Sequence, residues 1–205
     1  MASPLIRNSL LGFVIGGAAL VLLLEASSPR PAQKNPTYPR QILIIRHAEK
    51  PPDAAMSTDL SAPGKDRATA LHKLFEKSDT RPTPFPKPDF IFAAKDSGKS
   101  KRPVQTVTPL ASKLDLPVDA RFTNDDPVKL AEELFGNAKY EGKTILISWR
   151  HGTTPELAAV LNATSFPKTW KDDVFDRVWQ ITYGEKGKAT FADVPQRLMP
   201  ADSEN

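Results

Sequence analysis

From residue 38 onward the apolar positions of the chain follow two patterns. Short continuous runs, such as QILIIR at residues 41–46 and TILISW at residues 144–149, are typical of strands buried on both faces of a sheet. Between such runs apolar residues recur at helical spacing, as they do within residues 61–77. The same patterns predict further strands at residues 90–95, 118–122, 178–183 and 189–192, and further helices at residues 104–114, 128–135 and 155–161.

Strands and helices therefore alternate along residues 38–194, which we interpret as one domain. This alternation predicts an α/β fold, a three-layer α/β/α sandwich around a central, mostly parallel sheet. Residues 76–89 carry several prolines and are expected to form a long loop. Residues 195–205 are polar and are expected to form a flexible tail.

The N-terminal region has a different pattern. Residues 10–24 read LLGFVIGGAALVLLL without a charge, and a proline-rich linker follows as far as residue 37. The run is shorter than the roughly 20 residues of a typical spanning helix. It is typical of a signal peptide or a short anchor, so the chain is expected to be exported or attached to a membrane through residues 10–24. A buried N-terminal helix is the alternative, and the sequence leaves both cleavage and orientation open.

Composition limits the class of protein. A chain of 205 residues with 40% hydrophobic and 25% charged residues suits one globular domain with appendages. The net charge of +4 is too small for a nucleic-acid-binding surface, and the short basic cluster at residues 99–102 is typical of a solvated loop. The absence of cysteine excludes disulfides, thiol catalysis and cysteine metal sites.

Candidate chemistry lies at the ends of two predicted strands. The chain has three histidines, and two of them follow an apolar run and an arginine, as Arg46-His47 and Arg150-His151. Ligands of open α/β sheets bind beyond the carboxyl ends of the strands, so one pocket could hold both imidazoles. A neutral imidazole is a competent nucleophile near pH 7, and arginine binds phosphate oxygens through two N–H groups. The pattern therefore indicates phosphoryl chemistry, in a pocket whose arginines would repel a metal cation.

A further arginine precedes a predicted helix. Pro103 suits the first turn of a helix because its missing N–H costs nothing there. Arg102 would then lie at the helix N-terminus, where backbone N–H groups and the helix dipole favour an anion.

Four sequence pieces in this order resemble a known family. The pieces IIRHAEKP, LSAPGKDRATAL, RPVQTVTPLASKLDLPV and ILISWRHG, within residues 41–161, are similar to the motifs of the histidine phosphatase superfamily, also called phosphoglycerate-mutase-like. The chain resembles a small, bacterial-like member of the type written RHxE/K. Pro103 replaces the alanine that usually follows the second arginine.

The resemblance implies a mechanism and roles for four residues. His47 would accept the phosphoryl group as a phosphohistidine, Arg46 and Arg102 would bind its oxygens, and His151 would donate a further hydrogen bond. The implied activity is a phosphatase that hydrolyses a phosphomonoester or a related phosphorylated substrate without a cofactor or metal. Its partner would be a phosphorylated small molecule or a phosphoprotein.

Three other functions stay open at this point. They are phosphotransfer of the mutase kind, removal of phosphate from protein histidine, and a phospholigand-binding domain without turnover. The acid that would protonate the leaving group is not assigned. Its candidates also have structural interpretations, because Glu156 could form a capping box with Thr153 and the aspartates before Pro127 could cap a helix. The candidates are Asp96, Asp125, Asp126 and Glu156.

Three nearby residues are expected to have structural roles. Glu49 could hydrogen-bond an arginine, and Arg150 could simply end its strand. His72, within the first predicted helix, is expected at the surface or its boundary.

Overall fold

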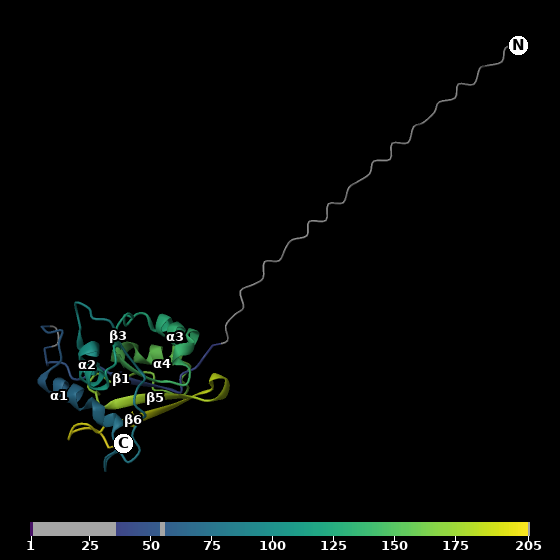
Figure 1. Ribbon diagram of the computed structural model, residues 1–205. Coiled ribbons are helices and arrows are strands. Elements are labelled where there is room, and N and C mark those ends of the chain that lie inside the picture. Colours follow the sequence, from purple (N-terminus) through teal and green to yellow (C-terminus); the bar gives the residue numbers. More distant parts are fainter. Residues whose placement is uncertain (2–35, 54–55, 205) are drawn as a thin grey trace. The chain divides into compact units, whose positions relative to one another are not determined.

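The computed structural model describes Met1, residues 36–53 and residues 56–204. Figure 1 labels the elements of the domain, which begins with β1 shortly after residue 36. The strands are β1 (Gln41–Arg46), β2 (Phe90–Ala93), β3 (Val118–Asp119), β4 (Thr144–Trp149), β5 (Arg177–Tyr183) and β6 (Ala189–Pro195). The helices are α1 (Ala62–Ala70), α2 (Arg102–Leu114), α3 (Pro127–Gly136) and α4 (Thr154–Val160), with 3-10 segments η1 (Leu71–Phe75), η2 (Ala138–Tyr140), η3 (His151–Thr153) and η4 (Glu185–Gly187).

The strands form one sheet in the order β3-β2-β4-β1-β5-β6. β1, β2, β3 and β4 pair in parallel, whereas β5 pairs antiparallel with β1 and β6 antiparallel with β5. The prediction of a mostly parallel sheet is confirmed. β1 and β4 are neighbours, although about a hundred residues separate them, because βαβ connections bring distant strands together.

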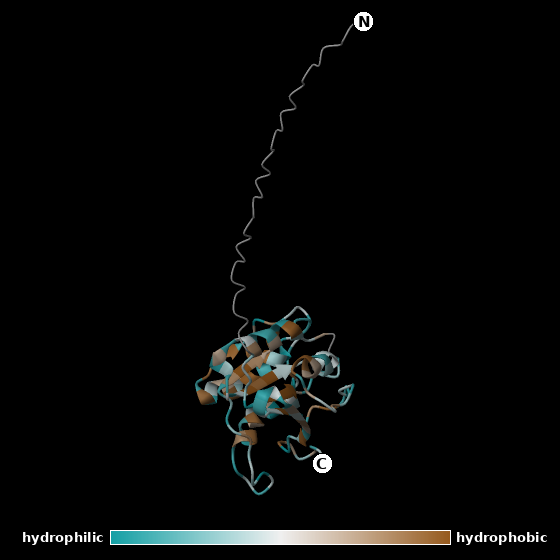
Figure 2. Ribbon diagram, turned by 90° about the vertical axis from the view of Figure 1, so that its right-hand side faces the viewer, coloured by the Kyte–Doolittle hydropathy of each residue, from teal (hydrophilic) through white to brown (hydrophobic). Residues whose placement is uncertain are grey.

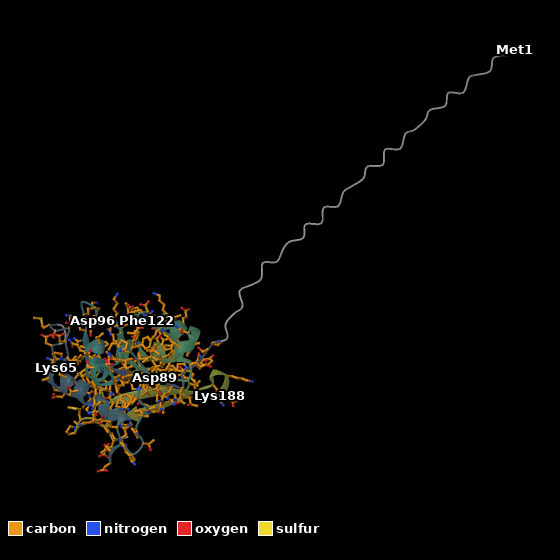
Figure 3. The ribbon with its side chains drawn as sticks, in the orientation of Figure 1. Met1, Lys65, Asp89, Asp96, Phe122 and Lys188 are labelled. Atoms are coloured by element: carbon orange, nitrogen blue, oxygen red, sulfur yellow. The ribbon has the colours of Figure 1, made fainter. Side chains whose placement is uncertain are left out.

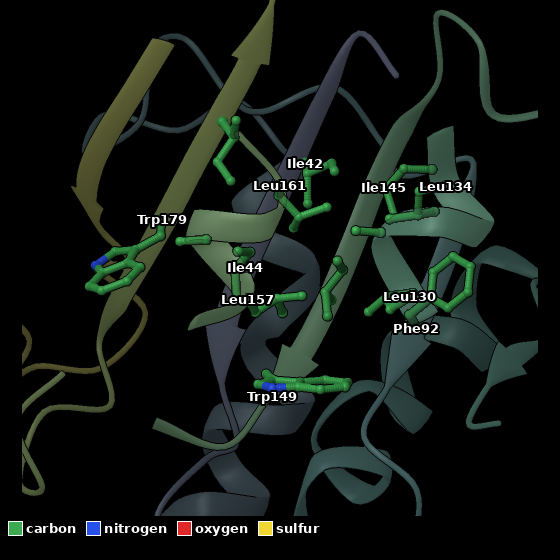
Figure 4. Packing of buried hydrophobic residues seen from close by; sticks show 14 of the residues in the cluster. Ile42, Ile44, Phe92, Leu130, Leu134, Ile145, Trp149, Leu157, Leu161 and Trp179 are labelled. Carbon is green, nitrogen blue, oxygen red and sulfur yellow. The ribbon is translucent and has the colours of Figure 1, made fainter. Parts of the chain in front are cut away.

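Helices cover both faces of the sheet. α3 and α4 pack on the face that carries Ile42 and Ile44, and Figure 4 shows Leu157 of α4 and Leu161, the residue after this helix, against these residues. η1 and α2 pack on the opposite face, which carries Leu43 and Ile45, and α1 packs against α2 and η1. Figure 2 shows hydrophobic residues concentrated on the central elements. Because successive strand residues point to opposite faces, each fully apolar run supplies both layers, and the predicted three-layer sandwich is confirmed.

Three elements differ in length from their predictions. The helix expected over residues 61–77 is α1 followed by the tighter turns of η1. The strand expected over residues 118–122 has two residues, because β3 lies at the edge of the sheet and pairs only with β2. β6 extends to Pro195, past the predicted residue 192, because it pairs with β5 over its whole length.

The export and membrane prediction is not upheld. Within residues 36–53 and 56–204, no helix is both long and apolar enough to cross a membrane. This finding contradicts the predicted export or membrane anchoring. Residues 10–24, on which that prediction depended, lie outside the described residues, as does most of the predicted linker.

The C-terminal segment, predicted to be a flexible tail, makes specific contacts. Gln196 is buried, and its side-chain oxygen accepts a hydrogen bond of 3.1 Å from Arg67 Nη1. The carboxylate of Asp202 accepts two hydrogen bonds from the same guanidinium, at 2.9 and 2.7 Å. The mobility of the segment stays a prediction, but these bonds connect it to α1.

Candidate active site

The end of β1 and the end of β4 lie side by side. The two strands pair in register from Gln41 opposite Thr144 to Arg46 opposite Trp149, and His47 N donates to Trp149 O at 3.1 Å. Parallel strands end at the same edge of a sheet, so the segments that follow them share that edge. The structure therefore brings the two Arg-His pairs to one place, as their position after the apolar runs suggested.

His47 is buried, with 4% of its surface exposed, and its ring orientation is fixed. Nδ1 lies 2.7 Å from Ala48 O. A carbonyl oxygen only accepts hydrogen bonds, so Nδ1 carries the proton and Nε2 has a free lone pair. Burial lowers the pKa of His47 to about 3, and Arg46, Arg102 and His151 act in the same direction. The hydrogen bond to Ala48 O opposes this shift. The ring is therefore neutral at pH 7, as a nucleophile must be.

The backbone after His47 is held by α2. Ala48 N donates to Thr106 Oγ1 at 2.9 Å, and Thr106 Oγ1 donates to Arg102 O at 2.7 Å. Thr106 is buried on the first turns of the helix. This pair of bonds fixes Ala48, whose carbonyl in turn fixes the imidazole of His47.

α1 holds the next residue, Glu49. Glu49 O accepts hydrogen bonds from Ser61 N and Ser61 Oγ at 3.0 and 3.1 Å, and Ser61 Oγ also caps α1 at Gly64 N. A Cβ at Gly64 would lie only 2.3 Å from Glu49 O, so this approach requires glycine. The Glu49 carboxylate accepts from Arg67 Nε at 2.9 Å, which matches the expectation that it would bind an arginine.

Arg46 is the most enclosed charged group of the site, with 1% of its surface exposed. Nη1 donates to the carbonyl oxygens of Lys171, Asp172 and Val174 at 3.1, 2.7 and 3.0 Å, and Phe175 stacks 3.9 Å from the guanidinium carbon. Nε and Nη2 are buried and have no partner among the described residues. Burial lowers the pKa of Arg46 to about 10, so the group stays charged at pH 7. Two N–H groups are thus left for an anion.

His151 lies in η3, directly after β4, with 18% of its side chain exposed. Its Nε2 contacts the carboxylate of Asp172, while Nδ1 is buried without a partner among the described residues. Burial lowers the pKa of His151, Arg46 lowers it further, and Asp172 opposes both. His151, like Arg46, therefore presents one unpartnered nitrogen.

Arg102 begins α2, as predicted, with Pro103 in the first turn. Its Nε donates to Asp59 O at 3.1 Å, and its Nη2 donates to Ser57 O. Its charge contributes to the low pKa of His47, so the guanidinium lies within electrostatic range of that ring. Contact between Arg102 and a phosphoryl group stays a prediction.

The segment 171–176 was missed by sequence reasoning. It supplies three carbonyl oxygens, the Asp172 carboxylate and the Phe175 ring to this site. No motif marks it, but its position carries a signal. β5 runs antiparallel to β1, so residues just before β5 lie at the same edge as residues just after β1.

Within the described part of the chain, none of the four candidate acids forms a hydrogen bond or an ion pair with His47, Arg46 or His151. Asp126 binds Lys129 and Thr123, which lower its pKa to about 2, and Asp125 is exposed beside it. Asp96 is exposed, and the preceding Lys95 N donates to Phe122 O; Figure 3 labels Asp96 and Phe122 on the upper edge of the domain. Glu156 is exposed on α4.

Two capping predictions are wrong. Neither Thr153 nor Asp126 makes a side-chain hydrogen bond to the helix that it precedes. The hydroxyls of Thr153 and Thr154 donate instead to Arg150 O, at 3.4 and 3.0 Å, and Asp126 accepts from Thr123. Short-range side-chain bonds within each turn have displaced the expected caps. Arg150 itself is exposed, and His72 is partly exposed on η1.

Among the described residues, no three histidine, aspartate or glutamate side chains gather as a metal ion would require. The site instead combines a buried neutral imidazole, a buried guanidinium and a second imidazole with unpartnered nitrogens. Such a set suits an oxyanion.

Comparisons with family models and with curated protein sequences find no match. Solved structures, however, match over most of the chain at low sequence identity.

Three of these structures show the likeness. A protein assigned as an alpha-ribazole-5′-P phosphatase from Escherichia coli matches with a TM-score of 0.54 and 16% identity, over 80% of this chain and 99% of that one. A phosphoserine phosphatase variant from Entamoeba histolytica gives 0.51 and 10%, over 78% and 98%. The phosphoglycerate mutase from Bacillus anthracis gives 0.50 and 15%, over 77% and 93%. The predicted resemblance is confirmed for the fold, and the RHxE/K subtype stays a prediction.

Proposed function

We propose that the protein is a phosphatase that hydrolyses a phosphomonoester or a related phosphorylated substrate through a phosphohistidine on His47. One observation carries the proposal. The free Nε2 lone pair of a buried neutral imidazole lies at the same sheet edge as three buried nitrogens that lack partners among the described residues, namely Arg46 Nε, Arg46 Nη2 and His151 Nδ1. Buried polar groups are nearly always hydrogen-bonded, so nitrogens at one edge that have no partner among the described residues support an oxyanion-binding site there.

The chemistry has two steps. In the first, the Nε2 lone pair forms a bond to phosphorus, the bond from phosphorus to the ester oxygen breaks, and the leaving oxygen takes the electron pair and then a proton from solvent. In the second, water attacks phosphorus, the P–N bond breaks, and Nε2 regains its lone pair while the proton of water passes to solvent. Arg46 would bind equatorial oxygens in both steps through Nε and Nη2.

The three carbonyl bonds to Arg46 Nη1 support this role. They fix the plane of the guanidinium, so Nε and Nη2 keep one direction. Donors fixed before the substrate arrives need no reorganisation in the transition state, which is where preorganised charge accelerates phosphoryl transfer.

An aryl phosphate with a stable leaving group tests the proposal, because it needs little help from a general acid. We expect turnover by the wild type and a loss of at least roughly 10⁴-fold in kcat for His47→Ala, since the nucleophile is gone. His72→Ala is the matched control, because His72 is partly exposed on η1 and should leave the rate unchanged. Equal rates for the wild type and His47→Ala would refute the proposal.

A binding domain without turnover is the second candidate. One observation favours it: among the described residues, none of the four candidate acids forms a hydrogen bond or an ion pair with His47, Arg46 or His151. Binding of inorganic phosphate by the wild type, with no aryl phosphate turnover, would identify this function. Acid-labile label on His47, together with exchange between two phosphorylated acids, would instead identify phosphotransfer of the mutase kind.

A further inference from the structure

We infer that Asp172 is a positioning residue that favours the imidazolium form of His151, in which the buried Nδ1–H is donated to the bound oxyanion. The inference rests on the proposed function for its catalytic part. Its structural part, the protonation state of His151, can be measured on its own.

The contact between His151 and Asp172 defines the geometry. Asp172 approaches Nε2, and the carboxylate can only accept a hydrogen bond, so Nε2 must carry a proton. In a neutral ring the proton on Nε2 would leave a lone pair on Nδ1, and that lone pair would repel a phosphoryl oxygen. Only the imidazolium donates to the carboxylate through Nε2 and to an anion through Nδ1 at the same time.

Asp172 is placed by the backbone rather than by its own side chain. Arg46 Nη1 binds the carbonyl oxygens on both sides of this position as well as Asp172 O itself. The residue is therefore fixed by the group that also faces the anion, although 77% of its side chain is exposed. The same guanidinium thus sets the position of the carboxylate that accepts the Nε2–H of His151 and stabilises its charged form.

The charges around His151 show why a carboxylate is needed there. Arg46 from β1, Lys50 from the loop after β1 and Arg150 from its own segment all lower its pKa, in addition to burial. His47, the other imidazole of the site, also faces it electrostatically. The carboxylate of Asp172 acts in the opposite direction and raises the pKa of His151. Without it the ring would lose its proton at a lower pH.

The low histidine count makes the protonation state directly measurable. In a His72→Gln background two imidazoles remain, and His47 with a pKa of about 3 does not titrate between pH 5 and 9. The second imidazole signal is then that of His151, and its midpoint is read separately from that of His47. We expect Asp172→Asn to lower its midpoint by about 0.5 to 1 pH unit, the size of a partly screened charge contact.

Asp173→Asn is the matched control. Asp173 also acts electrostatically on Arg46, so this variant removes the same charge from the same neighbourhood but leaves the pair with His151 intact. We expect its midpoint to move by less than half as much. An unchanged midpoint in Asp172→Asn, or equal shifts in the two variants, would overturn the inference.

A second readout tests the catalytic part. Because His47 is neutral throughout, kcat/KM for an aryl phosphate should fall as pH rises through the His151 midpoint. In Asp172→Asn this fall should begin at a pH that is lower by about 0.5 to 1 unit, the same shift as that expected from NMR. A wild type without turnover would refute the proposed phosphatase, while the NMR titration would still decide the role of Asp172. Turnover with an unmoved pH profile would overturn the catalytic part of the inference.

Discussion

The two Arg-His pairs have the same letters and different environments. Arg46 and His47 are buried, with 1% and 4% of their surfaces exposed, whereas Arg150 is exposed and His151 is intermediate. The register explains the difference, because Arg46 pairs with Trp149 and not with Arg150. Figure 4 shows Trp149 at the tip of β4, among the core residues on that face. A shift of one residue turns a strand side chain to the other face, so the repeated dipeptide is not a structural repeat.

The two strand ends therefore contribute different groups to the candidate site. The β1 end supplies a buried neutral imidazole and a buried positive charge, which are fixed by carbonyl oxygens, α1 and α2. The β4 end supplies one imidazole, held by an exposed carboxylate. We therefore expect substitutions after β1 to cost more stability than the matching substitutions after β4.

Replacement of each of the two arginines by methionine is the strongest test of this difference. Arg46→Met would leave three carbonyl oxygens without their shared donor and is expected to lower the free energy of unfolding by about 4 kcal/mol. Arg150→Met is expected to change it by less than about 0.5 kcal/mol, as exposed positions do. Urea denaturation at pH 7 measures both. Similar losses for the two variants would show that the strand ends are equivalent.

The two histidines of the candidate site should differ in their effect on acid stability. The pKa of His47 is about 3 in the folded chain and near 6.5 when unfolded, so between these values only the unfolded chain binds the proton. Its contribution to stability is complete above pH 6.5 and is lost as the pH falls toward 3. From pH 7 to pH 4 this loss is about 3 kcal/mol.

His47→Gln should remove that part of the pH dependence, so its unfolding free energy should fall less than that of the wild type on acidification. His151→Gln should recover less, because the ring is partly exposed and Asp172 offsets the burial. Urea titrations at pH 7, 5 and 4 compare the three proteins, and carboxylates that titrate in all of them cancel. Equal slopes for His47→Gln and the wild type would mean that His47 is not held neutral by burial.

Two glycines extend the comparison to the backbone. Gly64 lies where a Cβ would meet Glu49 O at 2.3 Å, whereas a Cβ at Gly152, next to His151, would meet nothing within 4 Å. Gly64→Ala should cost about 2 kcal/mol because α1 must move away from the loop after His47. Gly152→Ala should stay within about 0.5 kcal/mol. Thermal or urea unfolding separates them, and a tolerated Gly64→Ala would show that α1 does not fix that loop.

These contrasts show what the sequence could predict and what it could not. Continuous apolar runs located β1, β2, β4 and β5 because strands buried on both faces leave that pattern whatever their neighbours are. The pattern also placed His47 and His151 at one edge. It could not give the register between β1 and β4, which depends on packing of the whole sheet, so Arg46 and Arg150 looked alike.

Contacts that depend on distant backbone were also hidden. The carbonyls that bind Arg46 come from residues 171–176, and main-chain oxygens leave no mark in a sequence. The caps expected of Thr153 and Asp126 failed for the opposite reason, because local alternatives within each turn were stronger than the motif. The contacts of Asp202 could not be foreseen from a polar C-terminal segment.

Asp202 and Asp172 give the smallest and most specific test. Each carboxylate contacts a positively charged or protonatable group near one of the strand ends, but 2% of the Asp202 side chain is exposed against 77% of the Asp172 side chain. Asp202 binds Arg67, which in turn binds Glu49, and it also accepts from Leu198 N at 2.7 Å. Asp202→Asn keeps one acceptor oxygen while removing the charge, so a loss of about 1 kcal/mol is expected.

Asp172→Asn should leave the free energy of unfolding unchanged within error, because exposed ion pairs contribute little. Its effect should be confined to the protonation of His151, whereas Asp202→Asn should affect stability and leave that protonation alone. Urea denaturation and the His151 titration, measured on both variants, give four values that must follow this crossed pattern. If Asp202→Asn moves the His151 midpoint, or Asp172→Asn lowers stability as much as Asp202→Asn does, then the two strand ends are coupled and do not act independently.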